Sequence, residues 1–351
     1  MILKELTELN GISGNETKVM EFIKSHAVKY ADNITVDSMG NLIAMKKGSV
    51  GKYKVMLSAH MDEVGLMVTG YSEGMLKFKT VGGIDERILP GKRVLVGDER
   101  IPGIIGVKPI HVQEREERNV NIKIKSMYID IGVDKKEEAE ALSPLGEQIA
   151  FYSEYQELGT DCIKAKALDD RVGCSILIEA LKNSYEFDLY ACFTVQEEVG
   201  LRGSEVAAYS VRPDIALVIE GTTCSDVPGV DEQSYSSTMG GGAVLTIMDR
   251  TSYVDKELVK FLYNLGVQNN IKVQYKKTTT GGNDAGKIQL SGTGVKVASI
   301  SAPCRYIHSP VSVMSKNDYY ACLELTKLAL RELGKEETMK RLLNIGGEKN
   351  V

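Results

Sequence analysis

The chain has 351 residues, of which 43% are hydrophobic and 26% are charged, with a formal net charge of -5. This length exceeds what one hydrophobic core usually serves, so we expect two domains, and no apolar run is long enough to predict a membrane span. The acidic balance, without a basic patch, argues against nucleic-acid binding.

The first elements alternate between helix and strand patterns. Ser13-Gly-Asn-Glu16 matches a helix capping box and precedes an amphipathic pattern, so we expect a helix there. Its apolar positions are Val19, Phe22, Ile23 and Val28. The segments NITVDS and NLIAMKK, separated by turn residues, and the apolar run YKVMLSA that leads to His60 predict three strands.

The pattern changes between about residues 66 and 162, where short strand-like segments are broken by glycines and prolines. Such spacing predicts a small antiparallel barrel or sandwich. From residue 168 onward, helix patterns alternate with apolar strands, which predicts a mixed or mostly parallel α/β sheet. We therefore expect an α/β fold in which residues 1–65 and 163–351 form the main domain and residues 66–162 form an inserted β-rich domain.

Acidic and histidine side chains follow several of the predicted strands. Because the carboxyl ends of strands form the ligand crevice of an open α/β sheet, we expect these side chains to converge. They are His60 and Asp62, Glu197 and Glu198, Glu220, and His308, with Asp169 and Asp170 opening the helix after the insertion. Imidazoles and carboxylates without thiolates suit zinc, cobalt or manganese.

Each motif alone also has an ordinary explanation. A single H-x-D is often a surface pair, the acids at 197–198 fit a solvated turn, and those at 169–170 fit a helix N-cap. In combination they gain distinct roles. Residues two apart on a strand point the same way, so Asp62 can orient the imidazole of His60, while adjacent glutamates diverge, so one can bind metal and the other can move a proton.

Seven motifs in order carry a family resemblance over almost the whole chain. They are DSMGNLIA, SAHMDEVG, KALDDRVGC, VQEEVGLRGS, ALVIEGTTCSDVPG, TGGNDAGKI and APCRYIHSP. Together they resemble the dinuclear metallo-aminopeptidases of the glutamyl-aminopeptidase and cellulase-M group, relatives of the tetrahedral aminopeptidases. The resemblance implies an α/β/α metallo-exopeptidase domain whose inserted β-barrel-like domain, residues 66–162, serves oligomerisation.

The resemblance also implies how two divalent cations, zinc or cobalt, would be held. One would be bound by His60, Asp169 and Glu220. The other would be bound by Asp169, Glu198 and His308, so that Asp169 bridges both. Some relatives carry Asp in place of Glu220, and either side chain can bind a cation.

Two further roles follow from the resemblance. Glu197 would be the general acid/base, and Asp62 would be the carboxylate that orients His60. In related enzymes the peptide bond after the bridging aspartate is cis, so we expect a cis bond between Asp169 and Asp170.

The implied activity is release of N-terminal residues from short peptides, and several alternatives remain open. Metal-dependent deacylation of an N-acyl amino acid would use the same site without requiring a free substrate amine. An endo-1,4-glucanase is disfavoured because glycosidases use paired carboxylates and aromatic platforms, and this chain has no Trp and 6% aromatic residues. A metal-storing or scaffolding shell would not depend on Glu197.

The cellular location and the assembly of the protein are also expected from its sequence. The N-terminal residues lack the pattern of a secretory signal, and six scattered cysteines without a C-x-x-C pair are typical of reduced core thiols, so we expect a cytoplasmic protein. The resemblance implies a homo-oligomer, often a tetrahedral dodecamer. It also places Gly281–Asp284 near the specificity pocket, without indicating the preferred N-terminal residue.

Overall fold

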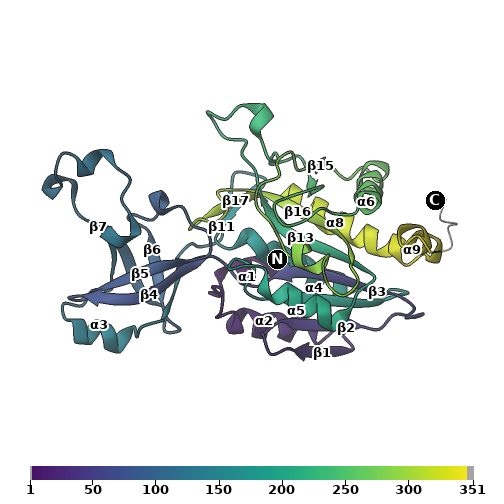
Figure 1. Cartoon of the computed structure of the whole chain (residues 1–351), viewed down its shortest axis with the longest axis horizontal. Coiled ribbons are helices and arrows are strands. Elements are labelled where there is room, and N and C mark those ends of the chain that lie inside the picture. The colour runs from purple at the N-terminus through teal and green to yellow at the C-terminus, as the bar shows by residue number, and fades with distance from the viewer. Residues whose placement is uncertain (1, 346–351) are drawn as a thin grey trace.

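The structure, a computed structural model, describes residues 2–345 and has two parts (Figure 1). One part is an 11-stranded sheet packed with helices, and the other is a closed antiparallel barrel that projects from it. Each part has its own hydrophobic core. The expected α/β fold with an inserted barrel is therefore confirmed.

The large sheet places four parallel strands at its centre. Its order is β1 (Asn33–Val36), β2 (Leu42–Lys46), β12 (Asp188–Thr194), β3 (Lys54–His60), β13 (Ile215–Thr223), β16 (Lys296–Arg305), β17 (Ser312–Ser315), β11 (Cys162–Ala165) and β10 (Gln156–Leu158), and β14 (Ala243–Leu245) pairs with β16 and with β15 (Val273–Tyr275). Strands β12, β3, β13 and β16 are parallel. They are almost fully buried, which explains why their sequences are continuously apolar. Their carboxyl ends share one edge of the sheet.

The helices of the large domain pack on the sheet or, in the case of α1 and α9, on another helix. They are α1 (Ile2–Glu8), α2 (Thr17–Ala27), α4 (Leu168–Leu181), α5 (Arg202–Val211), α6 (Lys256–Gln268), α7 (Ala285–Ile288), α8 (Lys316–Leu333) and α9 (Glu336–Leu342). Helix α4 contacts β3 and β13 and is covered by α1, α2 and α8, whereas α5 contacts α7 and β12. Within residues 2–345, none of the helices combines the length and apolar character that a bilayer crossing requires.

The barrel contains β4 (Gly65–Ser72), β5 (Met75–Val81), β8 (Met127–Asp130), β7 (Ile101–Val107), β6 (Arg93–Val96) and β9 (Gln148–Phe151), and α3 (Lys136–Leu142) contacts it. Leu66 and Val68, and Leu76 and Phe78, lie two residues apart and point into its core. Four short 3₁₀ turns lie between the barrel strands, at Glu86–Ile88, Ile110–Val112, Glu117–Asn119 and Ile124–Ser126. A fifth, Glu232–Ser234, lies between β13 and β14 of the large sheet. The barrel strands end at Phe151, and the next strands, β10 and β11, pair in the large sheet.

Two details of the helix predicted after Ser13–Glu16, which is α2, differ from the sequence prediction. Helix α2 begins at Thr17 with Glu16 in the N-cap position and without any side-chain cap hydrogen bond, so Ser13 lies three residues before the cap, and its hydroxyl donates to Asp62. Val28 follows the helix and is 61% exposed, so the buried side of the helix is formed by Val19, Ile23 and Ala27. The capping-box interpretation was therefore wrong, although the helix itself was predicted correctly.

Candidate metal centre

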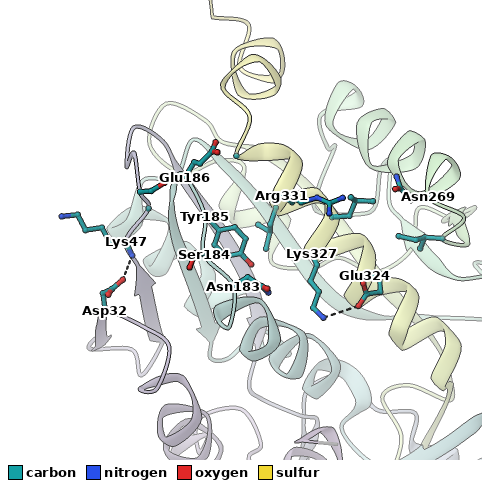
Figure 2. Close-up of a pocket in the computed structure, with 16 residues that line it drawn as sticks. Asp32, Lys47, Asn183, Ser184, Tyr185, Glu186, Asn269, Glu324, Lys327 and Arg331 are labelled. Atoms are coloured by element: carbon teal, nitrogen blue, oxygen red, sulfur yellow. Dashed lines mark hydrogen bonds and ion pairs between the residues drawn. The ribbon is translucent and has the colours of Figure 1, made fainter.

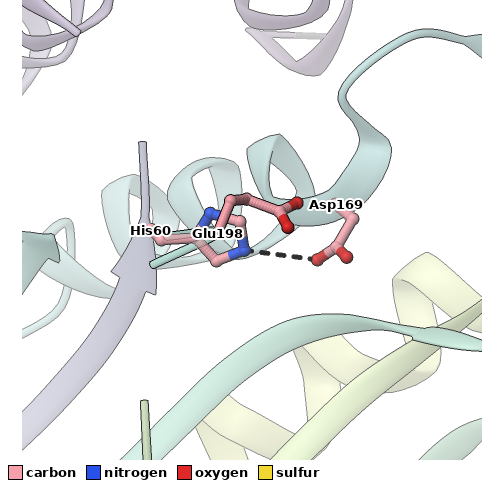
Figure 3. Close-up of side chains that lie close together, drawn as sticks. All are labelled: His60, Asp169 and Glu198. Carbon is pink, nitrogen blue, oxygen red and sulfur yellow. Dashed lines mark ion pairs between the residues drawn. The ribbon is translucent and has the colours of Figure 1, made fainter. Parts of the chain in front are cut away.

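The expected site residues gather at the carboxyl edge of the parallel strands. His60 ends β3, Glu220 lies near the end of β13, and Glu198 follows β12. One ligand atom from each of His60, Asp169 and Glu198 lies within 4.8 Å of the others. Figure 3 shows these three side chains lying together. The carboxylate of Asp169 reaches this group from the start of α4.

Asp169 lies at the centre of the cluster, with a histidine at each oxygen. Its Oδ1 is 3.4 Å from Nε2 of His60, and its Oδ2 is 3.6 Å from Nε2 of His308. The same His308 nitrogen lies 3.4 Å from Oε2 of Glu198. Glu220 is 5% exposed, and the charges of Glu197 and Asp169 act on it. Four of the five residues expected to bind metal, His60, Asp169, Glu198 and His308, thus form one cluster, and the buried Glu220 lies beside it on β13.

The two aspartates at the start of α4 have different tasks. Asp170 Oδ1 accepts a hydrogen bond from the Gly173 amide at 2.9 Å, as a helix cap does, and its Oδ2 accepts one from the His60 amide at 3.1 Å. The bond between Asp169 and Asp170 is cis, which confirms that expectation. Gly221 lies so close that a Cβ there would be 2.9 Å from Asp169. Asp170 therefore holds the backbone at the start of the helix and at His60, while the side chain of Asp169 faces the two histidines.

Asp62 is fully buried and serves two loops. Its Oδ1 is 3.4 Å from Nδ1 of His60, and that nitrogen is 3.0 Å from the Asp62 carbonyl oxygen. With Nδ1 protonated, the Nε2 lone pair of His60 faces Asp169. The Asp62 carboxylate also accepts hydrogen bonds from the amides of Glu197, at 3.0 Å, and Glu198, at 3.1 Å. The second set of contacts was not apparent in the sequence.

The cluster contains an excess of buried acid. Seven carboxyl groups surround the two histidines: Asp62, Asp169, Asp170, Glu197, Glu198, Glu220 and Asp284. Burial raises the pKa of Glu220 well above its usual range, helped by Glu197 and Asp169, and raises the pKa of Glu198 to about 7. Burial also works to raise the pKa of Asp169, but the neighbouring imidazoles of His308 and His60 outweigh that effect and hold the pKa well below normal.

These features fit bound divalent cations. Carboxyl groups gathered out of water must either take up protons or be neutralised by positive charge, and cations with oxygen and nitrogen ligands do the latter. Oδ1 of Asp169 is buried and has no hydrogen-bond partner among residues 2–345, as expected of an atom that would face an ion. The donor set of imidazoles and carboxylates suits zinc or cobalt.

A buried ionic cluster behind the site was missed by sequence reasoning. Glu63 Oε1 is 2.6 Å from Lys166 Nζ and 3.5 Å from an Arg171 nitrogen, and the three side chains are at most 4% exposed. Lys166 and Arg171 also donate to backbone carbonyls of the first residues, including that of Leu9. A glutamate directly after H-x-D was the only sequence signal, and it does not distinguish a buried group from an exposed one.

Two hollows differ in their relation to the site. A small pocket beside the metal centre is lined by Asp169, Glu198 and His308 together with Phe151 from the barrel, so the inserted domain also borders the site. The second hollow is a groove of about 1010 Å³ near the amino end of β12. Figure 2 shows charged side chains such as Lys327 and Glu324 that line its walls. None of the expected site residues lines that groove.

Comparison with known proteins identifies the family of the chain. Residues 40–325 match the family described as M42 glutamyl aminopeptidase. A relative from Acetivibrio thermocellus is 38% identical over 92% of this chain and 96% of its own length, and the lysyl aminopeptidase of Pyrococcus furiosus is 30% identical over 95% and 96%.

Solved structures agree with the sequence relatives. An aminopeptidase from Desulfurococcus kamchatkensis superposes with a TM-score of 0.93 at 34% identity and covers 100% of this chain and 98% of its own. The TET1 peptidase of Pyrococcus horikoshii, which can assemble into a tetrahedron or a large octahedral shell, has a TM-score of 0.84 at 34% identity and covers 94% and 98%.

Proposed function

Because the chain belongs to the M42 glutamyl aminopeptidase family, we propose that it is a two-metal aminopeptidase that releases N-terminal residues from short peptides. The observation that carries the proposal is the convergence of His60, Asp169 and Glu198 within 4.8 Å at the carboxyl edge of the sheet. The acid excess around them and the unpartnered Asp169 oxygen support a metal-dependent reaction.

Five residues would hold the cations. We assign His60, Asp169 and Glu220 to one ion and Asp169, Glu198 and His308 to the other, with Asp169 between them. The position of Asp169, with His60 near one oxygen and His308 near the other, supports this bridging role. When bound, a pair of cations would lower the pKa of a water molecule and polarise the peptide carbonyl group.

Glu197 would move the proton in the reaction. Its Oε2 lies 4.0 Å from Nε2 of His60, it is 9% exposed, and its backbone is held by Asp62. A carboxylate so placed would accept the proton of the attacking water and deliver it to the leaving amine. The surplus of carboxylates beside it would bind the ammonium group of the substrate N-terminus, which would make the enzyme an exopeptidase.

The assembly is proposed on the likeness to the TET1 peptidase. We propose a homo-oligomer in which the barrel contributes the contacts, with twelve subunits in a tetrahedral shell. Light scattering of the purified protein would test this, since a monomer or dimer would contradict it. We also propose that the protein acts in the cytoplasm, which fractionation of the source cells would test.

Substrate chemistry is tested with matched peptides. Metal-stripped protein would be supplied with zinc or cobalt and given unblocked peptides, their N-acetylated counterparts and carboxymethylcellulose. Release of N-terminal residues from the unblocked peptides alone is expected, and the panel would name the preferred residue. Cleavage of the blocked peptides would favour the deacylase, and cleavage of cellulose the glucanase.

A further inference from the structure

In the segment Gly11–Glu16, the side chains of Ser13 and Glu16, whose spacing predicted a helix capping box, make their hydrogen bonds with other parts of the chain. Ser13 Oγ donates to Asp62 Oδ2 at 2.6 Å, and both side chains are buried. The same Asp62 oxygen accepts the Glu198 amide at 3.1 Å. Ser13 therefore helps fix the orientation of a carboxylate that also contacts His60 and the Glu197 amide.

Glu16 makes a parallel contact with the turn before Glu197. Its Oε1 accepts hydrogen bonds from the Gly14 amide at 2.8 Å and from the Gln196 amide at 3.1 Å. Gln196 has φ of 57°, a left-handed conformation that a residue with a side chain adopts at some cost. The glutamate is 6% exposed, and its bond holds the backbone of this turn in place.

The segment is itself attached to the strand end that carries His60. Gly11 and Glu63 exchange hydrogen bonds, the Glu63 amide donating to the Gly11 carbonyl at 3.0 Å and the Gly11 amide donating to Glu63 Oε1 at 3.1 Å. Ile12 forms a parallel bridge with Glu63. A Cβ at Gly11 would lie 2.6 Å from Val19, so a glycine is needed for this close approach. Residues 11–16 thus contact both the 60–63 and the 196–198 loops.

We propose that Gly11–Glu16 is a brace of the active site, in which Ser13 and Glu16 are positioning residues. Ser13 sets the Asp62 carboxylate that orients His60, and Glu16 sets the turn that presents Glu197. The proposal rests on the proposed function for its effect on turnover. The expected effect of the brace on metal affinity can be measured without any substrate, because Ser13 acts through Asp62 on His60, which is a proposed metal ligand.

Four variants and one matched control test the brace. Ser13→Ala removes the hydroxyl and Ser13→Thr retains it, while Glu16→Ala removes the acceptor and Glu16→Gln retains an acceptor oxygen. The control is Ser175→Ala, because the Ser175 hydroxyl also makes a buried 2.6 Å hydrogen bond, with Tyr319, which is not one of the expected site residues. Zinc affinity would be measured by competition with a chelating indicator, alongside kcat and KM on an unblocked peptide and Tm.

The proposal predicts that zinc affinity or kcat falls in the Ala variants while KM changes little. Loss of a group that orients a metal ligand or its partner typically costs about 10- to 100-fold in metal affinity or activity, so we expect losses of that size in zinc affinity or kcat for Ser13→Ala and Glu16→Ala. We expect KM to stay within about threefold, and the Thr and Gln variants to recover most of the loss. Ser175→Ala should lower Tm alone.

The outcomes separate the brace from the proposed function. If both Ala variants keep wild-type zinc affinity and kcat, with or without a fall in Tm, the brace is wrong. If the wild type cleaves no unblocked peptide, the proposed function is wrong, and zinc affinity still decides the brace. If Ser13→Ala does not fold, Ser13→Thr and the Glu16 pair decide it.

Discussion

The substitution Asp62→Asn tests how the site is held together. Oδ2 of Asp62 accepts from Ser13 and from the Glu198 amide, while Oδ1 accepts from the Glu197 amide and faces His60. Both oxygens act as acceptors, so an amide in either orientation turns its NH₂ group toward a backbone donor. At least one buried N–H is left unpaired, which costs about 1–3 kcal/mol of unfolding free energy.

The same substitution weakens the orientation of His60 and of the 197–198 turn. We therefore expect zinc affinity or kcat to fall by about 10- to 100-fold, the range for groups that orient metal ligands. Urea unfolding of the metal-free protein would measure the stability loss, and indicator competition would measure zinc affinity.

Asp318→Asn is the matched control. Asp318 is 1% exposed, and its two oxygens accept the amides of Gly240 and Gly242 at 2.6 and 2.7 Å, so its stability loss should be similar. Zinc affinity should not change in this control. Equal zinc affinity and turnover in Asp62→Asn and the wild type would refute the reasoning about Asp62.

Other predictions follow from the same geometry. Glu197→Gln should lower turnover by about 10²–10⁴-fold and leave metal content by mass spectrometry unchanged; retained turnover would move the base elsewhere. Glu63→Gln should cost about 3–5 kcal/mol in urea unfolding, because it leaves buried Lys166 without its anion, and an unchanged midpoint would contradict this. Burial lowers the pKa of Lys166 from 10.5 to about 8, so between pH 8 and pH 10.5 the unfolded chain binds more protons than the folded chain. The unfolding free energy should therefore rise with pH across this range in the wild type and should not show this rise in Lys166→Met. Chelation of the bound metal should lower Tm, and zinc at 100 times its Kd should restore about 2.7 kcal/mol of unfolding free energy. A Tm that does not change when zinc is added would exclude a metal site in the folded state.

Much of the fold could be predicted from the sequence because its signals are local. The buried parallel strands read as apolar runs, and the helices after residue 168 show clear periodicity. Short elements such as β14 and α7, and the first helix α1, were not predicted, because three to seven residues give little periodicity and depend on tertiary contacts.

The site was predictable only in part, for a different reason. His60, Glu198 and Glu220 follow strands, so topology alone suggested that they converge. The contacts of Ser13 and Glu16 could not be predicted, because their spacing also matches a capping box. Only the position of Asp62 in the folded chain shows that Ser13 bonds to it instead. The burial of Glu63 with Lys166 and Arg171 likewise depends on residues about a hundred positions apart.

The central claim is that this cluster holds two cations and uses them to cleave peptides with a free amino terminus. The most direct test is a titration of the metal-stripped protein with zinc or cobalt, in which bound metal per chain and hydrolysis of one unblocked peptide are measured at each step. The account predicts that activity saturates as two equivalents bind. Full activity without metal, or saturation of both quantities at a single equivalent, would contradict it.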